Sequence, residues 1–189
     1  MSLVLSTGFA CALVPAQVGD LIVGTAVSSV HAEGTWTMRN DRVLCDGAVR
    51  ECLLIVAQNA GLVARVGSVV SSGTVVWQAQ EKRLLRRLTD ATGLDMESAA
   101  VAAVAQERGV PMAILRTVSD LVDEDLPLDF TLFLRPTGWI KGMRSLIGRP
   151  SSIEGLNRLR KQSRMAADRL TEWFQRYTET DSESLRLSK

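Results

Sequence analysis

Residues 93–125, GLDMESAAVAAVAQERGVPMAILRTVSDLVDED, contain the elements that decide the fold. Residues 94–96 predict a short strand, and Glu97 opens a helix whose small apolar residues recur at helical spacing. Gly109, with a proline two residues later, ends that helix. The apolar run 112–118 has strand length and is typical of a strand covered on both faces. The stretch therefore predicts a strand–helix–strand unit of an α/β protein.

Two carboxylates lie at the ends of the two strands of this unit. Glu97 follows the first strand, and Asp120 follows the second strand directly after Ser119. Taken separately, a glutamate at a helix start is ordinarily a favourable dipole interaction, and a Ser-Asp pair after a strand is ordinarily a cap. A right-handed crossover would bring both carboxylates to one edge of the sheet, where α/β proteins place ligands. Their combination on one unit therefore predicts a binding site.

The segments DMESAAVA (95–102) and RTVSD (116–120) resemble the superfamily of purine nucleoside phosphorylases and methylthioadenosine/S-adenosylhomocysteine nucleosidases. In that family a Met-Glu pair binds the ribose, and a Ser-Asp pair after the next strand faces the purine. The resemblance implies that Met96 and Glu97 bind the sugar. Asp95 is expected either to line the same site or to be a salt-bridge partner.

The resemblance also implies cleavage of a purine N-ribosyl bond, with Asp120 as the catalytic acid and Ser119 orienting it. The sugar passes through a state with oxocarbenium character, so the departing purine must gain a proton. Asp120 can supply that proton near neutral pH only if burial favours its neutral form. Glu97 would accept hydrogen bonds from the ribose hydroxyls as positive charge grows on the ring.

The N-terminal segment predicts a short strand over 3–5 that ends in a Ser-Thr-Gly turn, followed by small residues and a second strand over 19–27. Its similarity to the family places Gly8, Phe9 and Ala10 at the pocket for the ribose and for phosphate or water; without it, Gly8 would be a plain turn glycine. Phosphate-dependent members carry an arginine and a serine around this turn. This chain lacks a cation there, which slightly favours hydrolysis.

The middle of the chain contains the expected purine-stacking residues. Residues 31–47 are polar and predict a surface loop, in which a lone histidine is ordinarily a surface residue. A helix over 49–60, a strand over 64–71, a turn and a basic helix near Gln78 follow. The family places an apolar or aromatic residue for the purine just after that turn, which corresponds here to Val76 and Trp77, although Trp77 could equally be core.

The C-terminal part predicts a helix over 152–177 with a basic, solvated face, and a disordered tail over 179–189. We therefore expect one nucleoside-binding domain over 1–178. The segment DEDLP with a later Gly-Arg-Pro break is similar to the hopanoid-associated branch of the family. That similarity implies adenosylhopane as a substrate.

Composition excludes several classes of protein. Apolar residues make up 46% and charged residues 23%, and the net charge of +1 gives no electrostatic case for nucleic acid or an acidic membrane. Three cysteines and one histidine lack metal-ligand spacing. Reduced thiols, no apolar run long enough to span a bilayer and no basic segment before the first apolar run favour a cytoplasmic protein.

The expected fold is α/β, with three layers: a mixed central β-sheet flanked by helices. Family domains begin with strands that precede the segment matching Leu3, and nucleosidases carry there a glutamate that activates water. We expect this chain to lack those strands, through truncation, completion by another chain or loss of catalysis. The open sheet edge would then favour a homo-oligomer, such as a dimer.

Two functions follow from the resemblance. The first is a nucleosidase or nucleoside phosphorylase acting on an adenosine-type nucleoside, without metal or organic cofactor and with phosphate at most as a co-substrate. The second is a catalytically impaired nucleoside-binding or assembly subunit. A dinucleotide enzyme is disfavoured because no G-x-G-x-x-G turn follows a strand.

Overall fold

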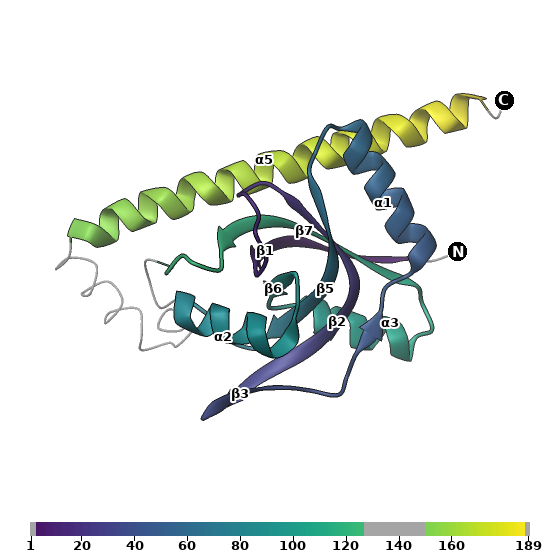
Figure 1. The fold of residues 1–189 in the computed structure, drawn as a ribbon. Helices are drawn as coiled ribbons and strands as arrows, with labels where there is room; N and C mark the ends of the chain where they lie inside the picture. Colours follow the sequence, from purple (N-terminus) through teal and green to yellow (C-terminus); the bar gives the residue numbers. More distant parts are fainter. Residues whose placement is uncertain (1–2, 127–149, 188–189) are drawn as a thin grey trace, which may run out of the picture.

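A computed structural model describes residues 3–126 and 150–187 of the chain (Figure 1). Strands and helices alternate along most of it, as predicted for an α/β protein. In chain order the elements are β1 (Val4–Ala12), β2 (Leu21–Glu33), β3 (Thr35–Met38), β4 (Val43–Leu44), α1 (Gly47–Asn59), β5 (Ala64–Ser72), α2 (Ala79–Thr89), β6 (Gly93–Asp95), α3 (Ser98–Glu107), β7 (Met112–Leu121) and α5 (Pro150–Leu187).

The strands form one mixed sheet in the order β3-β2-β5-β6-β1-β7, with β4 paired to β2. β1 runs parallel to β7, and β5 runs parallel to both β2 and β6. β6 is antiparallel to β1. β2 also pairs with β7, so the sheet curls back on itself (Figure 1). The prediction of a mixed sheet flanked by helices is confirmed.

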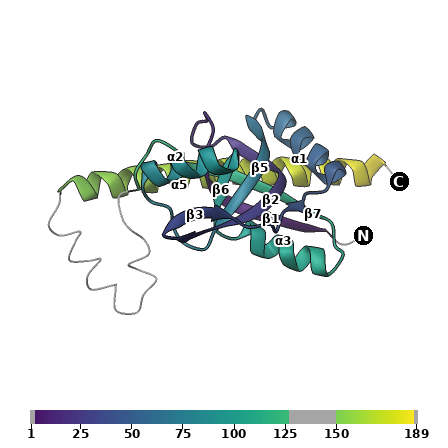
Figure 2. The same ribbon diagram turned by 60° about the horizontal axis from the view of Figure 1, so that its bottom comes forward.

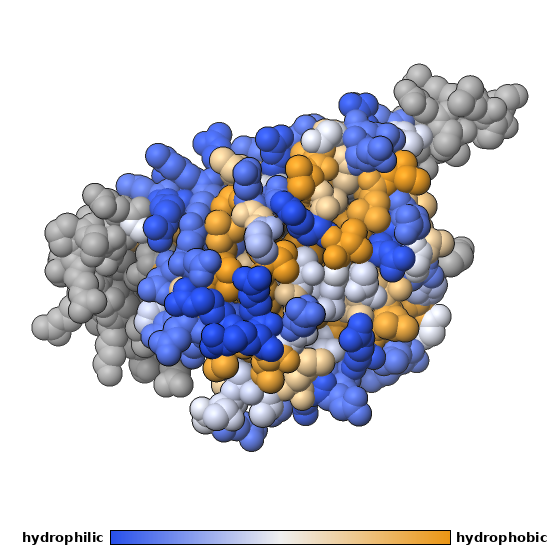
Figure 3. Space-filling view, in the orientation of Figure 1, coloured by the Kyte–Doolittle hydropathy of each residue, from blue (hydrophilic) through white to orange (hydrophobic). Residues whose placement is uncertain are grey.

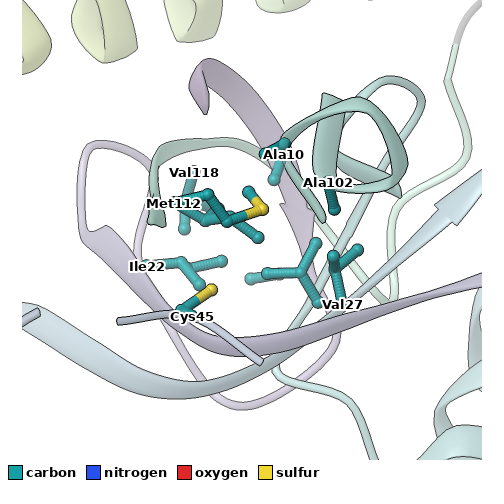
Figure 4. Packing of buried hydrophobic residues seen from close by; sticks show 11 residues of the cluster. Ala10, Ile22, Val27, Cys45, Ala102, Met112 and Val118 are labelled. Atoms are coloured by element: carbon teal, nitrogen blue, oxygen red, sulfur yellow. The ribbon is translucent and has the colours of Figure 1, made fainter. Parts of the chain in front are cut away.

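Helices cover the sheet from several sides (Figure 2). α1 and α5 pack on one face, where Leu21 and Leu115 of the sheet meet Trp173 of α5 in one buried cluster. The indole N–H of Trp173 donates a hydrogen bond to the backbone oxygen of Leu53 at 3.2 Å, which ties α5 to α1. A second cluster, shown in Figure 4, packs Ala102 of α3 against strand residues including those from β1, β2 and β7.

The strand β7 explains why this core forms. Residues 112–118 are all buried, as expected for an apolar run covered on both faces. α3 begins after Glu97, which is its N-cap, and the chain leaves it through Gly109 at φ +61°, as predicted. β6 before α3 spans Gly93–Asp95, one residue earlier than expected.

β1 is longer than predicted because its glycine is not a turn residue. The strand continues through Gly8 at φ +148°. A Cβ atom at this position would lie 2.5 Å from Nη1 of Arg116, which belongs to the neighbouring strand β7. Gly8 therefore serves the close approach of an arginine side chain rather than a change of chain direction.

Two other predicted segments differ in the structure. Residues 31–47 are not a plain loop, because β2 continues to Glu33 and turns through Gly34 at φ +82° into β3. β3 then pairs antiparallel with β2. α5 runs to Leu187 and so includes residues 179–187, which the sequence analysis placed in a disordered tail.

Hydrophobic surface gathers on the face that carries α1 and β5 (Figure 3). Ile55 of α1 is 54% exposed, and Val66 of β5 is 48% exposed. Such a patch is a candidate contact surface for a second copy of the chain.

Candidate active site

A cleft of about 150 Å³ lies where the ends of β1, β6 and β7 meet. Polar groups from β7 and from the start of α3 face it together with apolar side chains. It is lined by Phe9, Ala10, Cys11, Thr74, Val75, Val76, Leu94, Asp95, Met96, Glu97, Ser119, Asp120 and Leu126.

Strand register brings the two predicted carboxylates into this cleft. Cys11 at the end of β1 pairs with Leu94 of β6 on one side and with Asp120 of β7 on the other. A register shift after Ala10 sets the second pairing. β6 and β7 therefore run in opposite directions on either side of β1. The expected right-handed crossover between parallel strands is thus not what brings Glu97 and Asp120 into one cleft.

Asp120 is 8% exposed, and both of its carboxylate oxygens have partners. The Ser119 hydroxyl donates to Oδ1 at 2.9 Å. The Lys82 ammonium from α2 donates to Oδ2 at 2.7 Å, and the Lys82 side chain is fully buried. Burial, and next the nearby Asp120 charge, raise the pKa of the Cys11 thiol well above its usual range. The environment of Asp120 is therefore charged and hydrogen-bonded rather than simply apolar.

A second buried ion pair lies beneath the cleft. Nε of Arg116 is 2.8 Å from Oδ2 of Asp95, and both side chains are almost completely buried. Nη2 of Arg116 donates to the hydroxyls of Ser6 at 3.0 Å and Ser98 at 2.9 Å. The Ser71 hydroxyl donates to Oδ1 of Asp95. This network joins β1, β5, β6 and β7 to the start of α3.

Glu97 is placed differently from the other two carboxylates. Its side chain is 64% exposed, and its Oε2 is 3.7 Å from Nη2 of Arg116. Met96 beside it is 37% exposed, and Phe9 across the cleft is 41% exposed. Glu97 is thus a charged acceptor open to a ligand, with apolar side chains next to it.

Most residues predicted for the site do line the cleft, but two do not. Gly8 lies beneath it, against Arg116. Trp77 lines a separate hollow at the start of α2, whereas Val76 lines the cleft. His31 lies on β2. Within the described residues, its imidazole ring has one hydrogen-bond partner, the Thr37 hydroxyl.

Sequence reasoning missed two cations. The motif RTVSD by itself assigns no role to Arg116, and the sequence predicts no cation near the Ser6–Phe9 segment. Pairing of β1 with β7 sets Arg116 directly opposite Gly8, so that expectation is wrong. Lys82 lies in a helix of basic residues, and nothing in that pattern distinguished it from Arg83, which is exposed.

Across residues 3–126 and 150–187, no group of three or more His, Cys, Asp and Glu side chains is arranged to hold a metal ion. Within the same residues, no helix has the length and apolar character needed to cross a bilayer.

Comparison with known proteins identifies the family. Residues 1–135 match the phosphorylase superfamily. The chain belongs to this superfamily. The resemblance seen in the 95–102 and 116–120 motifs is thereby confirmed. The relatives described next are nucleosidases.

Curated relatives of this superfamily match a limited segment. The aminodeoxyfutalosine nucleosidase of Helicobacter pylori is 35% identical over 79 residues, which cover 42% of this chain and 34% of that protein. The 5′-methylthioadenosine/S-adenosylhomocysteine nucleosidase of Staphylococcus aureus is 29% identical over 80 residues, covering 42% and 35%. The match spans about a third of each relative's length.

Solved structures show the same fold over more of the chain. The 5′-methylthioadenosine/S-adenosylhomocysteine nucleosidase of Campylobacter jejuni superposes with a TM-score of 0.57 at 25% identity, covering 76% of this chain and 67% of that one. The Helicobacter pylori nucleosidase with butyl-thio-DADMe-Immucillin-A gives a TM-score of 0.61 at 22% identity, covering 90% and 67%.

Proposed function

We propose that this protein binds an adenosine-type nucleoside in the cleft and hydrolyses the bond between its purine and its ribose. The observation that carries the proposal is the shared cleft, in which the Ser119–Asp120 pair and the Met96–Glu97 pair line one cavity. A nucleoside has a sugar and a base at its two ends. These two pairs offer one polar group for each end, in a family whose matched members are nucleosidases by name.

Each pair has a distinct role in this proposal. Asp120 gives a proton to the base as it leaves, and the Ser119 hydroxyl holds Oδ1 of that carboxyl group in place. Glu97 accepts hydrogen bonds from ribose hydroxyls, which strengthen as the ring gains positive charge. Met96 and Phe9 supply apolar contact area for the nucleoside.

Asp95 supports the site without needing to contact the ligand. Its ion pair with Arg116 fixes the turn between β6 and α3, and Met96 and Glu97 are the two residues of that turn. Ala10 and Val76 complete the apolar lining, and Gly8 allows the Arg116 side chain to lie against β1.

Water is the proposed nucleophile because the cations near the cleft are already paired. Arg116 lies 2.8 Å from Asp95 and 3.7 Å from Glu97. Lys82 is paired with Asp120. Among the described residues around the cleft, a phosphate dianion would meet carboxylates without an unpaired cation to hold it. The proposal includes no metal or organic cofactor, and phosphate could enter only as a co-substrate.

The substrate class is an adenine nucleoside with a 5′ substituent. The names of the relatives include methylthioadenosine, adenosylhomocysteine and aminodeoxyfutalosine. The similarity of DEDLP and the later Gly-Arg-Pro break to the hopanoid branch adds adenosylhopane to the compounds worth testing. The segment between those two motifs lies outside the described residues.

A second candidate function is nucleoside binding without turnover. One observation favours it: both oxygens of Asp120 accept hydrogen bonds, one of them from a buried ammonium, as an ionised carboxylate would. An ionised Asp120 has no proton to give to the base.

Adenine release distinguishes the two functions. Purified protein is incubated with methylthioadenosine, adenosylhomocysteine and adenosylhopane, with and without phosphate, and adenine and the sugar product are measured by chromatography. Hydrolysis predicts free sugar at a rate that phosphate does not change, whereas phosphorolysis predicts a sugar phosphate. Binding measured by calorimetry without any adenine release would establish the second function instead.

Asp120→Asn and Asp123→Asn form the matched pair of variants for this assay. Asp123 has the same charge and lies three residues away, but it is exposed and pairs with Arg83 outside the cleft. Asp120→Asn is expected to slow adenine release by about 100-fold or more while substrate still binds. Asp123→Asn is expected to keep the wild-type rate. Equal rates for the two variants would remove Asp120 from the mechanism.

A further inference from the structure

Lys82 is a buried cation directly behind the proposed catalytic acid. Its side chain has no exposed area, and its ammonium lies 2.7 Å from Oδ2 of Asp120. The same nitrogen donates to the backbone oxygens of Glu124 at 2.9 Å and Leu121 at 3.4 Å. An ammonium has three N–H donors, and these three acceptors use all of them. Burying a lysine ammonium without such partners costs free energy, and here the fold supplies an acceptor for each of its N–H groups.

The two oxygens of Asp120 have different surroundings. Oδ2 is held by Lys82, which belongs to α2 and does not line the cleft. Oδ1 accepts a hydrogen bond from Ser119, which does line the cleft. A substrate can therefore reach Asp120 but not Lys82, and any effect of Lys82 on the reaction must pass through the Asp120 carboxyl group.

The charge of Lys82 acts on the product of proton transfer. In the proposed hydrolysis the O–H bond of Asp120 breaks as an N–H bond forms on the base, and the electrons of the glycosidic C–N bond leave with the base. Asp120 becomes a carboxylate in this step, and a nearby ammonium stabilises it. The proton lost by the attacking water returns Asp120 to its acid form. Lys82 keeps its own proton throughout.

We propose that Lys82 is a positioning residue, which fixes the Asp120 carboxyl group and stabilises the carboxylate that Asp120 becomes when it protonates the departing base. This role rests on the proposed function. Among the described residues, the Cys11 thiol of β1 and the Ser119 hydroxyl lie beside the Asp120 carboxyl group. Glu124, after β7, offers its backbone oxygen to Lys82, while its carboxylate accepts a hydrogen bond from Gln162 of α5.

Lys82→Met and Lys82→Gln test this role. Both remove the charge, and Gln keeps N–H donors for Asp120. Arg83→Met is the matched control, because Arg83 is the next residue of α2 but forms an exposed pair with Asp123. Rates of base release are measured between pH 4 and 9, with two substrates. One is methylthioadenosine, and the other is a nitrophenyl riboside, whose leaving group departs without a proton.

Loss of the charge is expected to slow base release from methylthioadenosine by about tenfold or more, because that reaction needs the proton of Asp120. The nitrophenyl riboside is expected to be cleaved within about twofold of the wild-type rate, because it needs no proton from Asp120. Arg83→Met is expected to keep the wild-type profile with both substrates.

Each other outcome overturns a stated part of the reasoning. A wild-type protein that releases no base from any nucleoside refutes the proposed function, and this role of Lys82 falls with it. A wild type that releases base while both Lys82 variants keep its rate with methylthioadenosine refutes the role of Lys82 alone. Equal losses with both substrates, or failure of both variants to fold, would show that Lys82 serves the fold instead of proton transfer.

Discussion

Replacing Asp120 by asparagine tests whether its pairing with Lys82 is a buried ion pair. The Lys82 side chain is fully buried and that of Asp120 is 11% exposed, so removing the carboxylate charge leaves an ammonium without a counter-ion inside the protein. Breaking one side of such a pair costs about 3–5 kcal/mol. We expect about 3 kcal/mol, because the asparagine oxygen can still accept a hydrogen bond from Lys82. For a chain of this size that lowers Tm by about 6–12 °C.

The double variant Asp120→Asn/Lys82→Met separates charge from shape. Removing both charges leaves no unpaired ion, so the double variant is expected to be more stable than Asp120→Asn alone. Thermal unfolding followed by circular dichroism measures all three proteins. The exposed pair of Arg83 and Asp123, at 3.0 Å, supplies the control cycle. Its single and double variants are expected to change the free energy of unfolding by no more than about 1 kcal/mol.

The reasoning is refuted if the double variant is less stable than Asp120→Asn by the same free energy of unfolding that Lys82→Met costs on its own. Additivity would mean that the two groups do not interact in the folded protein, and the charged environment assigned to Asp120 would be wrong. The unfolding data also serve as a control for the activity assay. If Asp120→Asn is folded at the assay temperature, its loss of activity is not caused by unfolding.

Further predictions concern the glycine of β1, the thiols and the assembly. Gly8→Ala places a Cβ 2.5 Å from Nη1 of Arg116 and is expected to destabilise the protein by about 1–3 kcal/mol and slow catalysis, measured by thermal unfolding and adenine release; a wild-type Tm would contradict it. Burial raises the pKa of Cys11 well above its usual range and that of Cys45 to about 11, so both thiols stay protonated at pH 8. A thiol reagent should then titrate only exposed Cys52 in the native protein and all three cysteines in denaturant, and Cys52→Ser should abolish the fast phase. Sedimentation velocity is expected to show a dimer, and a monomer at all concentrations would contradict that expectation.

Most of the fold could be predicted because periodicity and helix signals agreed locally. The run 112–118 and the helix after Glu97 appear where apolar pattern and breakers placed them. The paths of β1 and β2 could not be predicted in the same way. Gly8 has the local signature of a turn, and only a side chain from residue 116, distant in sequence, explains its place within a strand.

The candidate site shows the same division between local and distant information. Met96, Glu97 and Asp120 could be selected because each occurs in a short motif with a known chemical use. Lys82 could not, since basic residues on a helix are ordinarily solvated and its burial depends on backbone oxygens 39 and 42 residues away. The sequence predicts Val76 and Trp77 together beside the purine, and only the folded chain shows that Val76 lines the cleft and Trp77 lines a neighbouring hollow.

The charge balance of the cleft links its structure to the proposed choice of nucleophile. Both buried cations, Lys82 and Arg116, are within 2.8 Å of a carboxylate oxygen. A phosphate dianion would have to compete with Asp120, Asp95 and Glu97 for the same cations, and each carboxylate left without its partner would bear a desolvation cost. Water is neutral and requires no such exchange. Phosphorolysis would need a further cation beside the cleft, and the described residues that line it include none, whereas the proposed hydrolysis needs no change in the ion pairs.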